Sequence, residues 1–243
     1  MLINNLLKQK KKLHFTTLDS NKQSPSESAK LAKLCAEFGT DAIMVGGSTG
    51  IIQEVVNATV QEIKKEVALP IILFPNGAGS ISKYAEHILF MSLLNSNNAR
   101  YLIKEQAMAA QYIKKYSINP ISVGFIVIST SKIPTTVEKI GQIDIIRGTD
   151  IKKALDYALA AQYLGMSCIF LEAGSGADKP VPNDMIAAIK KEINIPLIVG
   201  GGIRDATTAK EKIESGADVI VTGTIIEKDI SKLKNIIKAI HDS

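Results

Sequence analysis

The stretch "PLIVGGGIRDATTAKEKIESGADVIVTGT", residues 196–224, holds a complete strand–helix–strand unit. A short apolar run opens the stretch, another closes it, and each leads into a turn that contains glycine. Between the two runs, residues 205–215 have the pattern of an amphipathic helix that begins at a capping Asp and ends before a Gly. Two apolar strands joined by a helix are the repeating unit of α/β folds.

The same alternation of short apolar runs and longer amphipathic segments extends along the whole chain. The runs are mostly continuous, which is typical of parallel strands buried on both faces. We predict strands at residues 13–19, 41–47, 70–76, 87–94, 120–129, 167–174, 196–202 and 218–224. We predict helices at residues 24–38, 50–67, 98–116, 149–164, 183–193 and 205–215. Eight β/α units in 243 residues predict a single TIM-barrel domain over residues 1–243, with a short N-terminal helix at about residues 1–12.

One of the eight units is irregular. Only ten residues, 77–86, separate the third predicted strand from the fourth, which is too few for a full crossover helix. We therefore expect a modified (β/α)8 barrel that lacks a regular third helix, with apolar barrel surface left for a ligand or a partner subunit. The other long connection, residues 131–148, is interpreted either as a loop over the site or as a surface excursion.

Composition narrows the function classes. The net charge is +5 and the pI is about 9.0, but the lysines are scattered and the chain has no Trp, so nucleic-acid binding is not expected. The basic run at residues 8–12 is interpreted as a solvated helix end, with contact to anionic phosphates or a membrane surface as the alternative. Cys35 and Cys168 have neither disulfide-framework nor zinc-site spacing, and no apolar run approaches a membrane span, so we expect a cytoplasmic protein.

The last two strand ends are candidates for binding phosphate. In barrels of this type the active site lies at the C-terminal ends of the strands, and the loops after strands seven and eight commonly hold phosphate. Here those loops contain Gly200, Gly201 and Gly202, then Gly223 and Thr224. Glycines let the backbone approach an anion closely. The alternative is that they only make tight turns, and the pattern alone indicates a phosphorylated ligand rather than a reaction.

Three carboxylate or hydroxyl side chains follow other strands. Asp19 closes strand one and Ser48 follows strand two, and their oxygens are suitable partial ligands for Mg²⁺, although either could instead cap the helix that follows. Glu172 lies in "FLEAGSG", a glycine-rich turn in which a carboxylate should repel phosphate. The three histidines fall away from this end of the barrel, and no Ser or Cys has a partner that would activate it.

Four strings point to a known family. "DAIMVGGSTG", "LFMSLLNS", "YALAAQYLGMSCIFLEAGSGADKPVP" and the stretch quoted first closely resemble the geranylgeranylglyceryl phosphate synthase family, which includes bacterial heptaprenylglyceryl phosphate synthases. The resemblance covers about residues 13–229. It implies a barrel without its third helix and a Mg²⁺-dependent prenyltransferase. Such an enzyme joins a long isoprenoid, from its diphosphate, to the C3 hydroxyl of sn-glycerol 1-phosphate, the first ether-linking step of archaeal-type lipid synthesis.

The resemblance also implies roles for individual residues. Asp19 and Ser48 would hold Mg²⁺. The glycerol phosphate contacts would be Phe170, Leu171, Glu172, Ala173, Gly174, Ser175, Gly176, Gly201, Gly202, Gly223 and Thr224. We hypothesise that Glu172 accepts hydrogen bonds from the glycerol hydroxyls and takes the proton as the ether forms. The apparent conflict in "FLEAGSG" then disappears, because the ligand has an anionic end and a hydroxyl end.

The chain departs from the family pattern at three places. Asp-Pro-Asp-Lys becomes Asp-Ser-Asn-Lys at residues 19–22, and Phe-Pro-Gly-Asn becomes Phe-Pro-Asn-Gly at residues 74–77. The Tyr that usually precedes "LEAGSG" is Phe170. One acidic contact and one hydroxyl contact are therefore absent here.

Several alternatives stay open from the sequence. Geranylgeranyl diphosphate is the favoured donor, with a longer prenyl diphosphate as the alternative. An isomerase or epimerase of sugar phosphates and a non-catalytic phospholigand-binding barrel are the rival functions. A homo-oligomer, dimer or hexamer, is expected, and a peripheral membrane contact is an alternative. The prenyl groove is expected at the missing helix, where Ala107, Ala109 and Ala110 either border it or pack closely.

Overall fold

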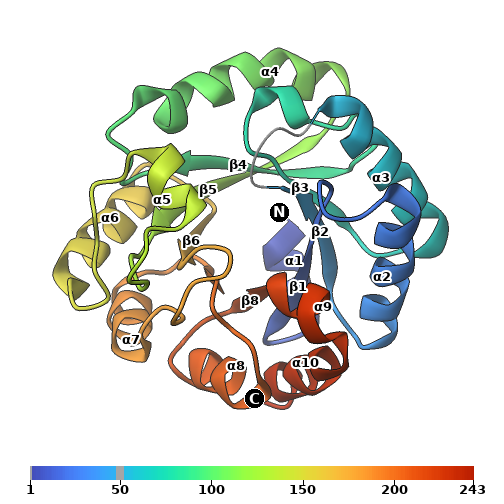
Figure 1. Ribbon diagram of the computed structural model, residues 1–243. Helices are drawn as coiled ribbons and strands as arrows, with labels where there is room; N and C mark the ends of the chain where they lie inside the picture. The colour runs from blue at the N-terminus through green and yellow to red at the C-terminus, as the bar shows by residue number, and fades with distance from the viewer. Residues whose placement is uncertain (1, 48–51) are drawn as a thin grey trace.

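The computed structural model describes residues 2–47 and 52–243 and shows eight parallel strands that close into a barrel (Figure 1). The strands pair in chain order, and β8 pairs with β1 to complete the ring. They are β1 (Leu13–Asp19), β2 (Ala42–Gly46), β3 (Ile71–Phe74), β4 (His87–Leu93), β5 (Asn119–Val127), β6 (Cys168–Glu172), β7 (Leu197–Gly200) and β8 (Val219–Thr222). The fold class and all eight predicted strands are confirmed.

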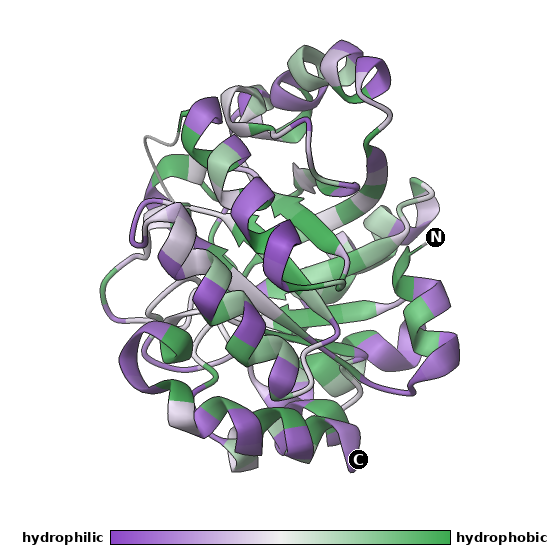
Figure 2. Ribbon diagram, turned by 90° about the vertical axis from the view of Figure 1, so that its right-hand side faces the viewer, coloured by the Kyte–Doolittle hydropathy of each residue, from purple (hydrophilic) through white to green (hydrophobic). Residues whose placement is uncertain are grey.

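The strands are buried on both faces, as their continuous apolar runs predict. In β6 every residue is buried, and its side chains alternate between two cores. Phe170 packs inside the barrel with Phe15, whereas Ile169 and Leu171 pack between the barrel and the helices. In Figure 2 the hydrophobic strands lie in the middle, and the surrounding helices alternate hydrophilic and hydrophobic segments.

Helices surround the barrel wherever the connections are long enough. The described ones are α1 (Leu2–Gln9), α2 (Pro25–Glu37), α3 (Gln53–Glu66), α4 (Glu105–Lys115), α5 (Thr136–Gly141), α6 (Ile151–Tyr163), α7 (Asn183–Glu192), α8 (Ala206–Glu214), α9 (Thr224–Asp229) and α10 (Leu233–His241). All six helices predicted between strands are present. No helix is predicted after strand eight, where α9, a 3-10 turn (Ile230–Lys232) and α10 follow. None of the helices in the described ranges is long and apolar enough to cross a membrane.

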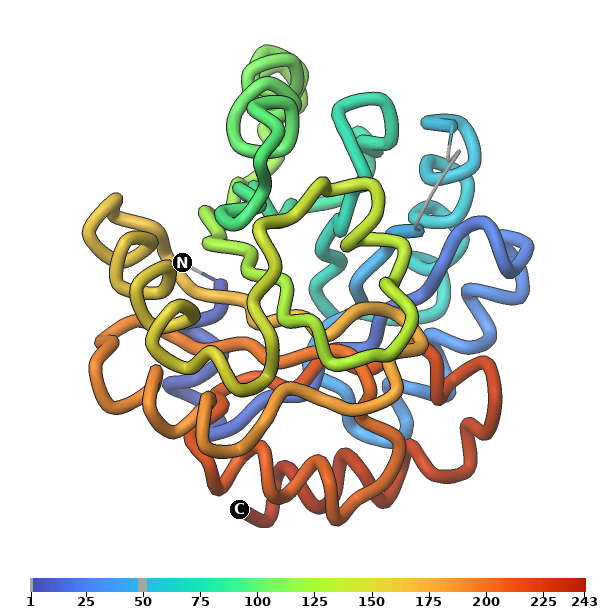
Figure 3. The backbone as a smooth tube through the Cα atoms, turned by 60° about the vertical axis from the view of Figure 1, so that its left-hand side comes forward, coloured from blue at the N-terminus to red at the C-terminus, as the bar shows by residue number. Residues whose placement is uncertain are grey.

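The third helix is missing, as the ten-residue connection predicts. In its place is the three-residue 3-10 helix η1 (Ala78–Ser80), which lies between α3 and α4 in Figure 3. The next connection begins with η2 (Arg100–Lys104), a single π-helical turn that continues into α4. Glu105, the first residue of α4, accepts a hydrogen bond of 2.7 Å from the Ala78 N–H. This hydrogen bond connects η1 to α4, the two segments beside the position of the missing helix.

The two ends of the barrel are closed differently. At the N-terminal end, α1 places Ile3 among the buried residues of the barrel interior. At the other end, residues 131–148 contain α5, whose first turn has a capping box formed by Thr135 and Glu138. This connection is therefore a structured segment over the C-terminal end of the strands.

The close packing of β2 on β3 at Gly46 can be tested by substitution. Gly46 is paired with Phe74, and a Cβ on Gly46 would lie 2.4 Å from the Phe74 carbonyl oxygen. We expect Gly46→Ala to lower the free energy of unfolding by about 2 kcal/mol, because the backbone must move to admit a methyl group. Urea denaturation measures this change.

The matched control is Gly79→Ala in η1, where nothing lies within 4 Å of the added Cβ. That variant should stay within about 0.5 kcal/mol of wild type. Equal stability of the two variants would contradict the packing argument.

Candidate active site

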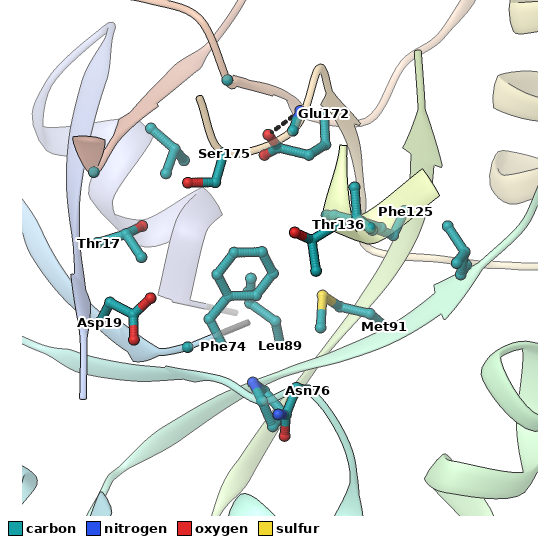
Figure 4. A pocket seen from close by; sticks show the side chains of 18 of the residues that line it. Thr17, Asp19, Phe74, Asn76, Leu89, Met91, Phe125, Thr136, Glu172 and Ser175 are labelled. Carbon is teal, nitrogen blue, oxygen red and sulfur yellow. Dashed lines mark hydrogen bonds between the residues drawn. The ribbon is translucent and has the colours of Figure 1, made fainter. Parts of the chain in front are cut away.

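A cavity of about 310 Å³ opens at the C-terminal ends of the strands and has one polar half and one apolar half. In the view of Figure 4, Thr17 and Asp19 lie on the left, Ser175 and Glu172 at the top, Met91 and Phe125 on the right, and the Phe74 ring near the centre. The cavity thus joins the predicted phosphate loops to the wall left open by the missing helix.

The loops after β7 and β8 present backbone N–H groups to the polar half. Gly201 and Gly202 have φ angles of +82° and +72°, a conformation that side-chain-bearing residues rarely adopt. Within residues 2–47 and 52–243, the N–H groups of Gly201, Gly202, Gly223 and Thr224 have no hydrogen-bond partner. Unpaired N–H groups converging on one cavity are suited to bind an anion.

Glu172 lies at the end of β6, where the β7 glycines cover its carboxylate. A Cβ on Gly200 would be 2.7 Å from Glu172 Oε2, and one on Gly201 would be 2.6 Å from Oε1. The residue is only 9% exposed, and Oε1 accepts a hydrogen bond of 2.6 Å from the Gly174 N–H (Figure 4). Burial raises the pKa of Glu172 from 4.5 to about 7, and the Gly174 hydrogen bond opposes this rise.

Three predicted contacts have side chains that do not line the cavity. Phe170 is fully buried inside the barrel, stacked 5.8 Å from Phe74 and edge-on 5.1 Å from Phe125, measured between ring centroids. Leu171 and Ala173 are buried between the barrel and the helices, and the Ala173 N–H is bonded to the Gly200 carbonyl. Contact of these residues with glycerol phosphate stays a prediction.

The rest of the predicted loop, Gly174 to Gly176, does line the cavity. Ser175 Oγ is 3.4 Å from Thr224 Oγ1, which joins the loop after β6 to the loop after β8. Arg204 lines the same half and donates to the carbonyls of Gly176, Ala177 and Asp178. The guanidinium therefore holds the loop in place.

The same loop is attached to the segment that carries α5. A Cβ on Gly174 would lie 2.6 Å from Thr135 Oγ1. Farther along, the Asp178 N–H donates to Ser131 Oγ at 2.9 Å, and the Lys132 N–H donates to an Asp178 carboxylate oxygen at 3.0 Å. Residues 130–138 and 174–179 thus form one paired structure beside the cavity.

Asp19 lines the polar half from the end of β1. Its Oδ1 accepts the Asn21 N–H at 3.0 Å, and its Oδ2 lies 3.7 Å from Lys22 Nζ. Capping of α2 is performed by Ser24 rather than Asp19, so the capping alternative for Asp19 is wrong. Ser48 lies outside the described residues.

The oxygen ligands available in the cavity fit Mg²⁺ better than they fit a metal that takes all of its ligands from protein side chains. The described ranges contain no cluster of three or more His, Cys, Asp or Glu side chains that could hold a metal. Mg²⁺ is usually bound by one or two protein carboxylates together with water and substrate phosphates. Asp19, a carboxylate that lines the cavity beside the anion site, matches that habit.

The apolar half follows β3, β4 and α4. Its lining side chains include Phe74, Ile81, Ile88, Leu89, Phe90, Met91, Leu93, Tyr101, Ala109, Phe125, Val137 and Ile140. Of the three alanines on α4 that are predicted either to border the groove or to pack closely, Ala109 lines the cavity, whereas Ala107 and Ala110 are exposed. The groove therefore lies where the missing helix would otherwise cover the barrel.

The histidines and cysteines are not part of the cavity wall. His14 is buried, with ring nitrogens 2.9 Å from Thr40 Oγ1 and Thr222 Oγ1, and burial lowers its pKa to about 3. Burial raises the pKa of Cys35 to about 11 and of Cys168 to about 12, so both thiols stay protonated. Neither residue type supplies a nucleophile here.

Four charged residues that line the cavity were not predicted from the sequence: Lys22, Glu105, Arg204 and Glu227. Lys22, Arg204 and Glu227 line the polar half, although no motif drew attention to them as site residues. Lys22 follows Asp19 by three positions, and Arg204 follows Gly201 by three, so proximity to a predicted strand end was an available signal. Glu227, one turn beyond Gly223, carried a weaker signal of the same kind.

The closed barrel, the glycine loops and the adjoining apolar groove define a phosphate-binding TIM barrel with room for an apolar chain. The sequence pattern of the PcrB family matches residues 4–242, and this chain belongs to that family.

Named relatives and solved structures are similar to this chain over most of its length. Geranylgeranylglyceryl phosphate synthase of Pyrococcus horikoshii is 50% identical over 220 residues, covering 90% of this chain and 85% of the relative. A wild-type GGGPS structure from Thermoplasma volcanium has a TM-score of 0.93 at 41% identity and covers 100% of this chain and 98% of its own. The (S)-3-O-geranylgeranylglyceryl phosphate synthase of Thermoplasma acidophilum, in complex with substrate sn-glycerol-1-phosphate, has a TM-score of 0.94 at 37% identity, covering 100% and 99%.

The raised pKa of Glu172 makes stability depend on pH. Below pH 4.5 the carboxyl is protonated in both the folded and unfolded chain, so its burial carries no ionisation cost. As the pH rises from 4.5 to about 7, the unfolded chain loses the proton first and the free energy of unfolding falls. Above pH 7 the cost reaches about 3 kcal/mol.

We therefore expect Glu172→Gln to stabilise the protein by up to about 3 kcal/mol at about pH 8.5 and to change little at about pH 4. Urea denaturation at both values measures the difference. Glu214→Gln, at a carboxylate that is 59% exposed, is the control and should show no such dependence. A constant difference between Glu172→Gln and wild type at both pH values would contradict the shift.

Proposed function

We propose that this protein transfers a geranylgeranyl group from its diphosphate to the C3 hydroxyl of sn-glycerol 1-phosphate, with Mg²⁺ as cofactor. The observation that carries the proposal is the single cavity in which unpaired N–H groups, a buried carboxylate and an apolar groove meet. The names of the relatives support the reaction, and the structure from Thermoplasma acidophilum supports the acceptor.

At the polar end, the chain would bind glycerol phosphate by both of its ends. The N–H groups of Gly201, Gly202, Gly223 and Thr224 would hold the phosphate. The hydroxyls would then face Glu172, on the neighbouring strand end. Fixing the acceptor beside the donor carbon removes much of the entropic cost of the reaction.

Glu172 would act as the general base. A carboxylate with a pKa near 7 holds a proton more firmly than an ordinary glutamate and can still be deprotonated at neutral pH. In this scheme the C1–O bond of the prenyl diphosphate breaks with its electron pair on the diphosphate. The glycerol C3 oxygen forms the new ether bond, and its proton passes to Glu172.

The diphosphate would lie toward Asp19. When bound there, Mg²⁺ would neutralise charge that develops on the leaving group. Asp19 would contribute one oxygen and keep its orientation through the Asn21 N–H bond. Ser48 stays a proposed second ligand.

The prenyl chain would lie in the apolar half of the cavity. Its lining by Phe74, Leu89, Met91 and Phe125 excludes water from the donor carbon and offers contact along the isoprenoid. Geranylgeranyl is proposed because the relatives compared above are geranylgeranyl enzymes; a longer prenyl diphosphate is the alternative.

Assembly and location are separate proposals. The family resemblance supports a homo-oligomer, dimer or hexamer, and the exposed Tyr163 and Leu164 are candidate contact side chains. Light scattering of the purified protein determines the oligomeric state.

Two buried, unpaired cysteines support a cytoplasmic location, which fluorescence tagging in cells tests.

One assay tests the function. The protein is incubated with sn-glycerol 1-phosphate, Mg²⁺ and a series of labelled prenyl diphosphates, and the products are separated by chain length. A glyceryl ether identifies the prenyltransferase and its preferred donor. Absence of any ether product, together with binding of glycerol phosphate, would favour a non-catalytic phospholigand-binding barrel.

Glu172→Gln should lower turnover by about 10²- to 10⁴-fold, because the amide cannot take a proton. In wild type, kcat/KM should rise with pH through about 7, since only the deprotonated carboxylate serves as base. Glu214→Gln is the surface control. Wild-type turnover in the Glu172 variant would remove this residue from the base role.

Asp19→Asn should reduce Mg²⁺-dependent turnover by at least about 100-fold, because the amide is a poor ligand for a hard cation. Binding of sn-glycerol 1-phosphate, measured by calorimetry, should stay within about threefold of wild type. Asp156→Asn, at a carboxylate on α6 that is 60% exposed, is the charge-matched control. Parallel loss of turnover and glycerol phosphate binding would indicate a folding defect instead.

A further inference from the structure

Lys22 forms a bridge between two carboxylates of the cavity. Its ammonium donates to Glu227 Oε1 and Oε2 at 3.0 Å each and lies 3.7 Å from Asp19 Oδ2. Asp19 ends β1, whereas Glu227 lies on α9, which begins at the loop after β8. The ammonium therefore lies between the proposed diphosphate end and the proposed glycerol phosphate end.

Lys22 is the cation of the cavity that is able to change partners. Among the residues that the structure describes, the lysine and arginine side chains lining the cavity are Lys22 and Arg204. Arg204 is engaged by three backbone carbonyls of residues 176–178. Lys22 has a side chain that is 44% exposed on a flexible four-carbon stem, and it is held only by side-chain carboxylates.

The two anions of the proposed reaction need different partners. In the proposed function, neutral N–H groups of the glycine loops would face the phosphate of glycerol phosphate. A diphosphate carries more charge and would meet Asp19 and Glu227, two carboxylates that repel it. A metal ion at Asp19 offsets part of this repulsion, and an ammonium beside it offsets more.

We propose that Lys22 binds the diphosphate leaving group of the prenyl donor, with Glu227 holding the ammonium in place until the diphosphate arrives. This inference rests on the proposed function. Lys22 keeps its proton and donates hydrogen bonds to the diphosphate oxygens, which receive the electron pair of the broken C1–O bond. Glu227 acts through Lys22 and is a positioning residue.

A purely structural role for Lys22 predicts something different. If the ion pair only fastens α9 to the loop after β1, then removing either partner has the same effect. That effect would fall on the loop before α9, which is part of the proposed glycerol phosphate site. The variants Lys22→Met and Glu227→Gln therefore separate the two roles.

The experiment is calorimetric binding of inorganic pyrophosphate and, separately, sn-glycerol 1-phosphate to the full chain, with Mg²⁺ and with a chelator. Lys22→Met should weaken pyrophosphate binding about tenfold under both conditions, the loss of one charge-assisted hydrogen bond. Glycerol phosphate binding should change less than about twofold. Glu227→Gln should bind pyrophosphate at least as tightly as wild type, and Lys22→Arg should restore most of the affinity that Lys22→Met loses.

Two results would overturn the inference. One is wild-type pyrophosphate affinity in Lys22→Met, and the other is equal weakening of glycerol phosphate binding in Lys22→Met and Glu227→Gln. Failure of the proposed function is recognised separately, because it means that the wild-type protein makes no ether product. Ether formation by wild type with unchanged pyrophosphate binding in Lys22→Met would overturn only the role of Lys22.

Discussion

The close approach of the β7 glycines to Glu172 is the constraint on which the site depends. Glycine at positions 200 and 201 lets the backbone lie against both carboxylate oxygens, where any side chain would collide. This contact removes the carboxylate from water and raises its pKa. The same backbone then turns through two left-handed residues and presents its N–H groups to the cavity. A proton acceptor and an anion site thus arise from one tight turn.

The apolar half of the cavity depends on the short connection between β3 and β4. Because residues 77–86 form only a 3-10 turn, no helix covers β3 and β4 on this side, and their apolar side chains line a groove. Phe74, Phe125 and Phe170 pack against one another inside the barrel, with ring centroids 5.1 to 5.9 Å apart. Two of these rings also line the cavity. The barrel core and the groove wall are therefore partly the same side chains.

The sequence predicts the strands well and the charged interior of the site poorly. Continuous apolar runs such as residues 167–174 are decided by local composition, and the missing helix follows from a count of ten residues. α5 was not predicted, although Thr135 and Glu138 have capping-box spacing, because its six residues are too few to show a helical period. The pair Lys22 and Glu227 is 205 positions apart, so only the closure of β8 on β1 brings it together. The pKa of Glu172 likewise depends on glycines from another strand, which no local pattern reveals.

The pairing of residues 130–138 with residues 174–179 limits how loops can be exchanged between such barrels. Residues 130–138 meet residues 174–179 through Ser131, Lys132 and Asp178, and Thr135 fills the space that Gly174 leaves. If residues 130–138 alone were replaced by those of a relative, Asp178 would lose its hydrogen-bond partners. A different side chain would then lie against Gly174. The exchangeable module is therefore two loops rather than one. A change in either loop would therefore affect both halves of the cavity, since Val137 and Ile140 line the apolar half and Gly174 to Gly176 line the polar half.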